Sequence, residues 1–333
     1  RSRALGQNCS HPRREPLRAR RIWGGIATLL GMSPPPIDDF DHRPSQAPTV
    51  KQFRGPGGLE MFRLMAGSAV AEVAPARGGI ITRFAVGKDE ILFLDEKTLA
   101  DRKEKVRGGV PVLFPIAGRL TGDRYLIDGL GYPMRQHGLA RHAAWEVINV
   151  AQAHLTMELR SSPATMVTFP FEFSCRLTVD VGRAGYRSLA IEMTVENRSK
   201  HRMPLHCGLH PYFLLADQDK QQAMVQVSAA QALDNTTGQA FAWAGTVDLA
   251  APEVDLHLHD VTERQATLQI PGKATRQFAW TELFSSIVLW TVAMKDFVCV
   301  EPWSGPADAF NTGVGLQLLA PGESRSGEFV ISI

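Results

Sequence analysis

The chain has 333 residues, of which 44% are hydrophobic and 21% charged, and its formal net charge is +2. This composition is typical of a globular domain, and so small a net charge argues against a protein of nucleic acid or of membrane surfaces. No apolar run approaches the roughly 20 residues that a membrane-spanning helix needs. The four cysteines (Cys9, Cys175, Cys207 and Cys299) form no C-x-x-C pair. We therefore expect no disulfide framework and a reducing, cytoplasmic compartment.

The first fifty residues differ in composition from the rest of the chain. Seven arginines stand against one acid, Glu15, among the first 21 residues, and a proline-rich stretch runs from Ser33 to about Pro48. The apolar run Ile22–Met32 after the arginines is typical of a secretory signal, but three glycines interrupt it and no A-x-A-like cleavage site follows. An upstream extension or a targeting segment stays open. We predict a disordered basic, proline-rich extension over residues 1–50 and a folded domain over residues 55–333.

Alternation of apolar and polar residues dominates the chain after residue 59. It is clearest over residues 171–181, 189–195 and 329–333, and a period of two indicates half-buried strands. Helical periodicity is nearly absent, although Thr98–Lys105 could form one or two turns. Many short strands separated by Gly, Pro, Asn and Asp predict an all-β fold, a large antiparallel β-sandwich. The shorter strand candidates are residues 60–64, 69–73, 80–86, 90–94, 145–150, 154–159, 224–227, 267–270, 287–292 and 297–300.

Two segments each end a predicted strand with a proton-transferring side chain beside a proline: Leu209–Leu214 contains His210, and Val298–Trp303 contains Glu301. Proline biases the residue before it to an extended backbone, which would hold His210 at the strand end. Together the two side chains supply an acid–base pair that needs no cofactor. The alternatives are a core histidine with both ring nitrogens satisfied and a glutamate in solvent at a sheet edge. Burying a carboxylate is costly unless it is paired or used.

A third histidine, His137, lies in the turn-like segment Gln136–Gly138, and loops carry functional residues more often than cores do. Metal binding is the competing interpretation of the histidines. His206, Cys207 and His210 form one possible cluster, and His257 with His259 forms another. Neither cluster has the H-E-x-x-H or C-x-x-C spacing of a zinc site. We therefore predict no metal and no other cofactor, and no G-x-S-x-G, P-loop or dinucleotide-binding motif is present.

Four motifs in this order resemble the aldose 1-epimerase (galactose mutarotase-like) family, and the resemblance covers about residues 59–333. The family's pattern is an arginine–glycine–glycine segment, a Q-H-G-x-A-R segment, an H-x-Y-F segment and a Glu-Pro element. The matching stretches are residues 106–115, 136–141, 210–213 and 301–303. The resemblance implies the large galactose mutarotase-like sandwich, with His210 as acid and Glu301 as base. It further implies that the sugar is held by His137, Arg107 and Arg141, with Asp255 as a weaker match to a sugar-contacting aspartate.

The function that the resemblance implies is aldose 1-epimerase activity, the interconversion of the α and β anomers of a hexose. Glu301 would take the proton of the C1 hydroxyl while His210 protonates the ring oxygen, and the opened sugar would reclose on the other face. A hexose-6-phosphate mutarotase is the closest alternative, since paired arginines suit phosphate. A non-catalytic sugar-binding module of the same fold is another. We expect a small-molecule sugar as the binding partner, no nucleic acid or membrane, and a monomer or weak dimer.

Overall fold

The computed structural model describes residues 47–333, so the expectation of a disordered extension falls almost entirely outside the described residues. The first strand, β1 (Thr49–Arg54), begins before residue 55, where the sequence pattern placed the start of the domain. Its sequence TVKQFR lacks apolar alternation and it has no fully buried residue, but it pairs antiparallel with β2 (Glu60–Ala66) along its whole length. Its strand structure therefore depends on pairing with β2. A truncation at residue 50 would remove the first two residues of β1.

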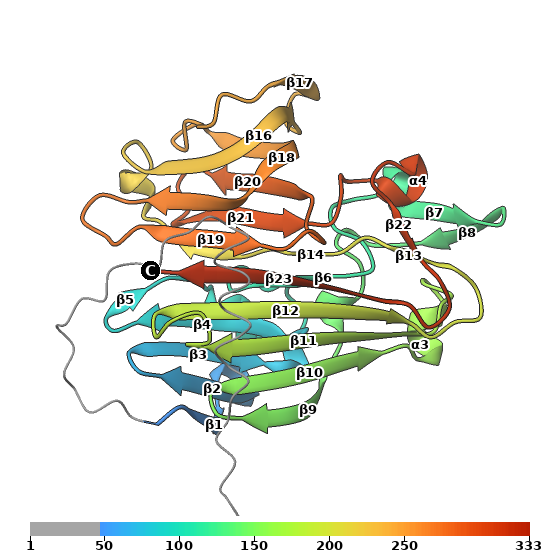
Figure 1. The fold of residues 1–333 in the computed structure, drawn as a ribbon, viewed down its shortest axis with the longest axis horizontal. Helices are drawn as coiled ribbons and strands as arrows, with labels where there is room; N and C mark the ends of the chain where they lie inside the picture. The colour runs from blue at the N-terminus through green and yellow to red at the C-terminus, as the bar shows by residue number, and fades with distance from the viewer. Residues whose placement is uncertain (1–46) are drawn as a thin grey trace, which may run out of the picture. The chain divides into compact units, whose positions relative to one another are not determined.

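The smaller sheet consists of the N-terminal strands in chain order, all antiparallel (Figure 1). Leu64 and Ala71 are paired across β2 and β3 and lie in the main core. On its other side Glu72 lies between Arg63 and Arg83 and contacts both guanidinium groups. This two-sided pattern is what the alternating sequence predicted. The strands after β2 are β3 (Ala69–Ala74), β4 (Ile80–Val86) and β5 (Asp89–Glu90).

The larger sheet comprises 14 of the described strands and joins segments that are far apart in the chain. Its main path runs β6 (Val112–Leu113), β14 (Gly208–Leu209), β21 (Phe297–Trp303), β20 (Ser286–Val292), β18 (Glu253–Gln269), β19 (Arg276–Trp280), β23 (Ser324–Ser332), β12 (Ser188–Asn197), β11 (Phe173–Val181), β10 (His154–Arg160) and β9 (Glu146–Ala151). Beside this path, β15 (Tyr212–Leu214) pairs with β21, and β16 (Met224–Asp234) pairs with β18 and with β17 (Gln239–Ala242).

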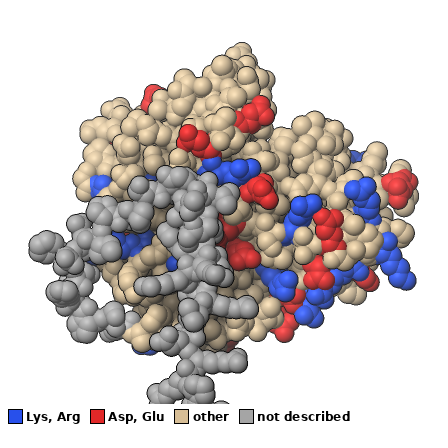
Figure 2. Space-filling view, viewed as in Figure 1, with Lys and Arg blue, Asp and Glu red and all other residues tan. Residues whose placement is uncertain are grey.

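One half of the larger sheet follows the predicted alternation closely. On β11, Cys175, Leu177 and Val179 are fully buried, whereas the polar residues between them are partly exposed. Charged side chains of both signs share the outer side, as in the contact of Arg183 with Glu192. Figure 2 shows this mixture of signs on the viewed face where grey atoms do not cover it. No single-sign patch of the kind that binds nucleic acid lies over these strands in that view.

The remaining described elements are short. Two pairs of strands stand apart from the large sheets: the hairpin of β7 (Arg124–Ile127) and β8 (Leu130–Pro133), and the pairing of two segments distant in the chain, β13 (Met203–Leu205) and β22 (Gln317–Leu319). The helical turns expected near Thr98–Lys105 occur earlier, as α2 (Glu96–Ala100), because the Asp95 side chain accepts bonds from the backbone N–H groups of Lys97 and Thr98 and so caps the helix there. The other helices are α3 (Pro163–Met166), α4 (Ala309–Thr312) and 3-10 turns at Pro56–Gly58, Pro75–Arg77, Thr121–Asp123, Ala140–His142 and Asp217–Asp219.

The prediction of an all-β, antiparallel sandwich is confirmed. Strands of the two sheets pack against one another, with β11 in contact with β2 and β3. The apolar sides of both sheets meet in one large cluster that includes Leu64, Ile191 and Val300. In the described part of the chain, no helix has both the length and the apolar character needed to cross a bilayer.

Candidate active site

The site is built on one side of the strands β15, β21, β20 and β18. The strand pairs Tyr212–Cys299, Cys299–Trp290 and Trp290–Asp255 place these four side chains in one row across the sheet. The next row runs from Glu301 through Val288 to His257. Because alternate residues of a strand point to the same side, Cys299, Glu301 and Trp303 all face the site. Val298 and Val300 face the opposite way and lie in the main core.

His210 joins this second row from the connection between β14 and β15. Gly208 pairs with Trp303 and Tyr212 pairs with Cys299, so His210 stands directly opposite Glu301. The imidazole Nδ1 lies 3.2 Å from Glu301 Oε1. The ring stacks on Tyr212 at 4.6 Å between centroids, with 5° between the planes, which fixes its orientation. The two predicted proton-transferring residues therefore meet, although 91 residues separate them in the chain.

Both members of this pair are removed from water: His210 is 6% exposed and Glu301 is 1% exposed. Glu301 lies inside β21 and not after its end, so the prediction that it ends a strand is wrong. The alternative of a glutamate in solvent at a sheet edge does not apply, because Glu301 is buried. The strand continues through Trp303 because Pro302 pairs with Ile287 on β20 and the ladder is not interrupted. His210 is not a satisfied core histidine, because its buried Nδ1 has no hydrogen-bond partner in spite of its closeness to Glu301.

Burial sets the protonation of the pair. Loss of hydration raises the pKa of the Glu301 carboxyl well above its ordinary value, and the indole N–H of Trp303, which donates to Oε2 at 3.1 Å, opposes that rise. Loss of hydration also lowers the pKa of His210 well below its ordinary value, and the nearby positive charge of Arg141 acts in the same direction. Both shifts favour the uncharged forms. Glu301 therefore carries a proton that it can give up, and His210 can accept one.

His137 occupies a tight turn beside the pair. Its backbone has a φ of 66°, and Gly138 after it has a φ of 75° with the Phe114 carbonyl oxygen only 2.3 Å from where a Cβ would stand. Only glycine fits there, which explains the His-Gly sequence. The backbone N–H of His137 donates to the Gly118 carbonyl, and its Nδ1 accepts from the Gly118 N–H at 3.0 Å. The ring proton is therefore on Nε2.

The environment keeps the His137 ring neutral. Burial first, and the positive charge of Arg141 second, lower its pKa to about 3. A neutral Nε2–H can donate a hydrogen bond to a substrate oxygen over the physiological pH range. The ring centroid lies 5.4 Å from that of His210 and 5.9 Å from that of Trp303. The structure thus brings His137 to the same site as the pair.

The two predicted arginines lie on connecting segments and not on the strands that carry the pair. Arg141 is half-buried and donates to the Val106 carbonyl oxygen at 3.5 Å, whereas Arg107 is exposed. The backbone N–H of Arg107 donates to the Thr98 hydroxyl at 2.9 Å, which ties Arg107 to α2. The positive charges of both arginines lower the pKa of His210, so both lie within electrostatic reach of the pair.

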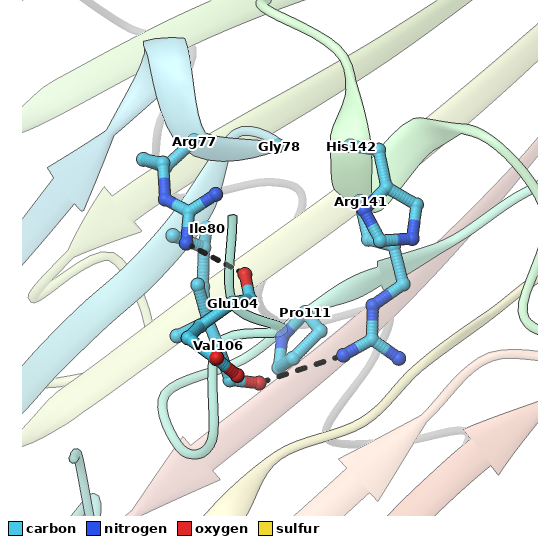
Figure 3. A pocket seen from close by; sticks show the side chains of 8 residues that line it. All are labelled: Arg77, Gly78, Ile80, Glu104, Val106, Pro111, Arg141 and His142. Carbon is cyan, nitrogen blue, oxygen red and sulfur yellow. Dashed lines mark hydrogen bonds between the residues drawn. The ribbon is translucent and has the colours of Figure 1, made fainter. Parts of the chain in front are cut away.

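Behind Arg141 is a small cavity that sequence reasoning did not find (Figure 3). Arg77 on its far side donates to four backbone carbonyls, those of Thr98, Leu99, Asp101 and Glu104, at 2.9–3.1 Å. Figure 3 shows Arg77 bound to Glu104 and Arg141 bound to Val106, two positions of one short segment. Arg77 therefore fixes the segment that leads to Arg107, and Val106 of the same segment binds Arg141. The cavity is lined by Arg77, Gly78, Ile80, Glu104, Val106, Pro111, Arg141 and His142.

Asp255 lies in the outer row of the site. It is partly exposed, and its two carboxylate oxygens have different partners: Asn235 Nδ2 donates to Oδ2 at 2.7 Å, and His257 Nε2 lies 3.3 Å from Oδ1. Its negative charge is one of the causes that raise the pKa of Glu301. Asp255 therefore has a fixed orientation and lies within electrostatic reach of the pair.

The histidine clusters considered for metal binding do not assemble as ligand sets among the described residues. His206 uses both ring nitrogens structurally: Nδ1 accepts from the Ala117 N–H at 3.3 Å, and Nε2 bonds the Gly305 carbonyl at 3.0 Å. His257 and His259 share one side of β18 as the alternation predicts, but their rings contact Asp255 and Ser286 respectively. The group of three that does converge is His210, Cys299 and Glu301.

Sequence reasoning did not single out the neighbours that complete the site. Trp303 bonds Glu301, Tyr212 stacks on His210, and Trp290 meets the His210 ring edge-on at 5.8 Å between centroids. A signal for Trp303 and Cys299 was available, because both stand two residues from Glu301 on a strand. No such signal exists for Arg77, which comes close to the segment 98–104 only through the packing of the whole chain.

The fold and these side chains define a large antiparallel β-sandwich with a buried acid–base pair. The sequence profile of the family described as aldose 1-epimerase matches residues 60–332, and the chain belongs to that family. The protein Slr1438 from Synechocystis sp. PCC 6803 is similar in structure, with a TM-score of 0.77 and 32% identity over 88% of this chain and 98% of that chain.

Two further proteins are similar to this chain. A galactose mutarotase-like protein from Lactobacillus casei ATCC 334 has a TM-score of 0.69 and 23% identity, over 82% of this chain and 99% of that chain, and shows the same fold. The "Putative glucose-6-phosphate 1-epimerase" of Cenchrus ciliaris is 24% identical over 282 residues, which are 77% of this chain and 82% of that protein. The predicted resemblance to the aldose 1-epimerase family is confirmed.

Proposed function

We propose that this protein is an aldose 1-epimerase that interconverts the α and β anomers of a hexose. The observation that carries the proposal is the buried contact of 3.2 Å between His210 Nδ1 and Glu301 Oε1. An acid and a base held side by side in a site closed to bulk water suit a reaction that moves one proton on and one proton off the same small molecule.

In the proposed reaction a proton first passes from the Glu301 carboxyl to His210 across their contact of 3.2 Å. Glu301, now a carboxylate, then takes the proton of the C1 hydroxyl. The electron pair of that O–H bond forms the C1 carbonyl, the bond from C1 to the ring oxygen breaks, and His210, as the imidazolium, protonates the ring oxygen. Rotation about C1–C2 and reversal of both transfers close the ring on the other face. Glu301 gains a proton as His210 loses one, so the total charge of the buried pair is constant throughout, which avoids a desolvation cost.

The other site residues have binding roles in this proposal. The neutral Nε2–H of His137 donates to a sugar oxygen, Arg141 and Arg107 donate to hydroxyl groups, and Asp255 accepts from a hydroxyl. Trp303 holds the Glu301 carboxylate through Oε2 and leaves Oε1 for the proton transfer. Aromatic side chains that surround the pair exclude water and strengthen these polar contacts.

Polarimetry of freshly dissolved α-D-glucose and α-D-galactose tests the proposal directly. We expect the purified protein to accelerate the approach to the equilibrium rotation, and Glu301→Gln to abolish the acceleration in a folded protein. A folded, unmodified protein that binds hexose without accelerating this change would instead be a sugar-binding module of the same fold.

A second candidate is a hexose-6-phosphate mutarotase. Burial first, and then the positive charges of Arg141, Arg135, Lys105 and Arg77, lower the pKa of His142, so these four cations lie within electrostatic reach of His142. Phosphate would neutralise such a group. The name of the Cenchrus ciliaris relative is in line with this candidate.

Salt dependence separates the two substrates. If phosphate meets these cations, kcat/KM for glucose 6-phosphate exceeds that for glucose and falls with ionic strength, because salt screens exposed charges. Arg107→Ala should then remove the preference for the ester while turnover of glucose changes little. Equal, salt-insensitive activity on both sugars would assign the arginines to neutral hydroxyls.

A further inference from the structure

Cys299 is a buried thiol at the site for which the proposed reaction has no use. It precedes Glu301 by two residues on β21, faces the same side of the sheet and is fully buried. One potential ligand atom from each of His210, Cys299 and Glu301 lies within 4.8 Å of the other two. The anomer exchange needs an acid and a base but no thiol. Cys299 packs against Tyr212 and Phe297, and its sulfur is free for another role.

The Nδ1 atom of His210 is a second, independent sign of a ligand. It is buried and lies 3.2 Å from Glu301 Oε1, but it forms no hydrogen bond with the described residues, and such nitrogens are rare because they cost free energy. An imidazole nitrogen, a thiol sulfur and a carboxylate oxygen that converge in this way are the donor types that bind Zn²⁺.

Charge balance favours a divalent cation in this buried position. A thiolate and a carboxylate together cancel the two positive charges of the ion, and the third ligand is a neutral imidazole. No net charge is then left in a region closed to water, which is the condition under which buried ions are tolerated. Binding at neutral pH releases the thiol proton, and also the carboxyl proton wherever Glu301 carries one.

We propose that His210, Cys299 and Glu301 form a binding site for a thiophilic divalent cation such as Zn²⁺ or Cd²⁺, and that occupation of this site inhibits the enzyme. The inhibition rests on the proposed function, since the ion takes the two groups that would move the protons. Hard cations such as Mg²⁺ do not bind, because they prefer oxygen ligands and do not compensate for loss of a proton from sulfur.

The experiment measures binding and inhibition separately. Co²⁺ is titrated into chelator-treated protein in the presence of a non-thiol reductant, and the sulfur-to-metal charge-transfer absorption is followed. The shift of the unfolding temperature with Cd²⁺ gives a second measure of binding. Anomer exchange is then assayed with Zn²⁺ and again after addition of EDTA. The variants are Cys299→Ala and Cys299→Ser, with Cys175→Ala and Cys207→Ala, two other buried free thiols, as matched controls.

We expect one equivalent of Co²⁺ to give the charge-transfer band in the unmodified protein and in both controls, and neither Cys299 variant to give it. Zn²⁺ should inhibit the unmodified protein and EDTA should restore the rate, whereas the Cys299 variants should need at least a tenfold higher Zn²⁺ concentration for half inhibition. Two Cys299 variants are used so that the failure of one to fold leaves the test intact.

Three results would overturn the inference: no charge-transfer band in the unmodified protein, a band that survives in a Cys299 variant, or equal Zn²⁺ sensitivity with and without the thiol. Binding through Cys299 without inhibition would overturn the inhibitory role. Failure of the proposed function is recognised separately, because metal-free protein would then lack anomer exchange while the band and the temperature shift still report on the site.

Discussion

Two strands of the same sheet, β11 and β21, use polar residues in opposite ways. On β11 the polar residues Arg176, Thr178 and Asp180 alternate with buried apolar ones and are partly exposed. On β21 all seven residues are buried, including Glu301. A polar residue on the exposed side of a strand costs the folded state little free energy. A carboxyl group on a strand whose two sides are both buried costs several kcal/mol unless it is paired. The buried position of Glu301 is therefore unfavourable for folding by itself, in contrast to the polar residues of β11.

Among substitutions of polar residues on these two strands, Glu301→Gln should have the largest effect on activity. The amide preserves the shape of the side chain but cannot accept the C1 proton, so we expect kcat to fall by about 10³- to 10⁴-fold. The free energy of unfolding should stay the same or rise, since a buried ionisable group is removed. Asp180→Asn on β11 is the matched control, and it should leave kcat unchanged. Polarimetry measures the turnover of the two variants, and thermal denaturation measures their stability. Near-normal turnover in folded Glu301→Gln would show that Glu301 is not the base.

His210→Asn should have the next largest effect. We expect kcat to fall by about 10²- to 10³-fold with KM changed little, because the acid is lost while the sugar contacts of His137 and Asp255 remain. Full kinetic curves with one hexose provide the measurement. If KM rises and kcat is preserved, His210 binds the sugar and the acid lies elsewhere.

A third test concerns the pH dependence of the protein's stability, to which the buried His206 near the site contributes. Burial lowers the pKa of His206 to about 4, below the usual 6.5 of an unfolded chain. Between these two pH values the unfolded state binds more protons, so the free energy of unfolding falls as the pH falls from 6.5 towards 4. His206 alone accounts for on the order of 3 kcal/mol of this loss.

Urea unfolding of the unmodified protein and of His206→Asn at several pH values between 4 and 8 isolates this contribution as the difference between the two profiles. The variant is expected to be less stable at pH 8, where the neutral ring bonds Ala117 and Gly305, and to lose less stability on acidification. Parallel profiles would show that the ring is not buried in its neutral form.

The smallest expected effect belongs to Arg77→Gln. Without its bonds to four carbonyls, the segment that carries Arg107 and holds Arg141 is less fixed, and we expect KM to rise about fivefold with little change in kcat, the equivalent of about 1 kcal/mol. Arg63→Gln on β2 is the control, because Arg63 forms an ion pair with Glu72 away from the site.

A double variant sharpens this last test. If Arg77 acts through Arg141, then Arg77→Gln should no longer change KM when Arg141→Gln is already present, since residues that act as a unit are not additive. A loss of stability with an unchanged KM would mean that Arg77 only holds the fold together.

The sequence by itself predicted most of the strands from local pattern. Ile80–Val86 has the same bounds in the structure, and the alternation over residues 173–181 is that of β11. It did not predict β1 or most of β18, which forms a strand of 17 residues although only residues 267–270 were expected. Those segments lack clear alternation, and their strand structure depends on hydrogen bonds from neighbours that are distant in the chain.

The candidate site divides in the same way. Motif order pointed to His210, Glu301, His137, Arg107, Arg141 and Asp255, and the structure brings the first three into one cluster, with the others within electrostatic reach or one row away. The sequence could not show that Glu301 is buried inside β21 or that Arg77 holds the segment that carries Arg107. Alternation along a strand is a local property, and the sequence displays it directly. Burial and side-chain proximity depend on which strands pair and in which register, and the packing of the whole chain decides that.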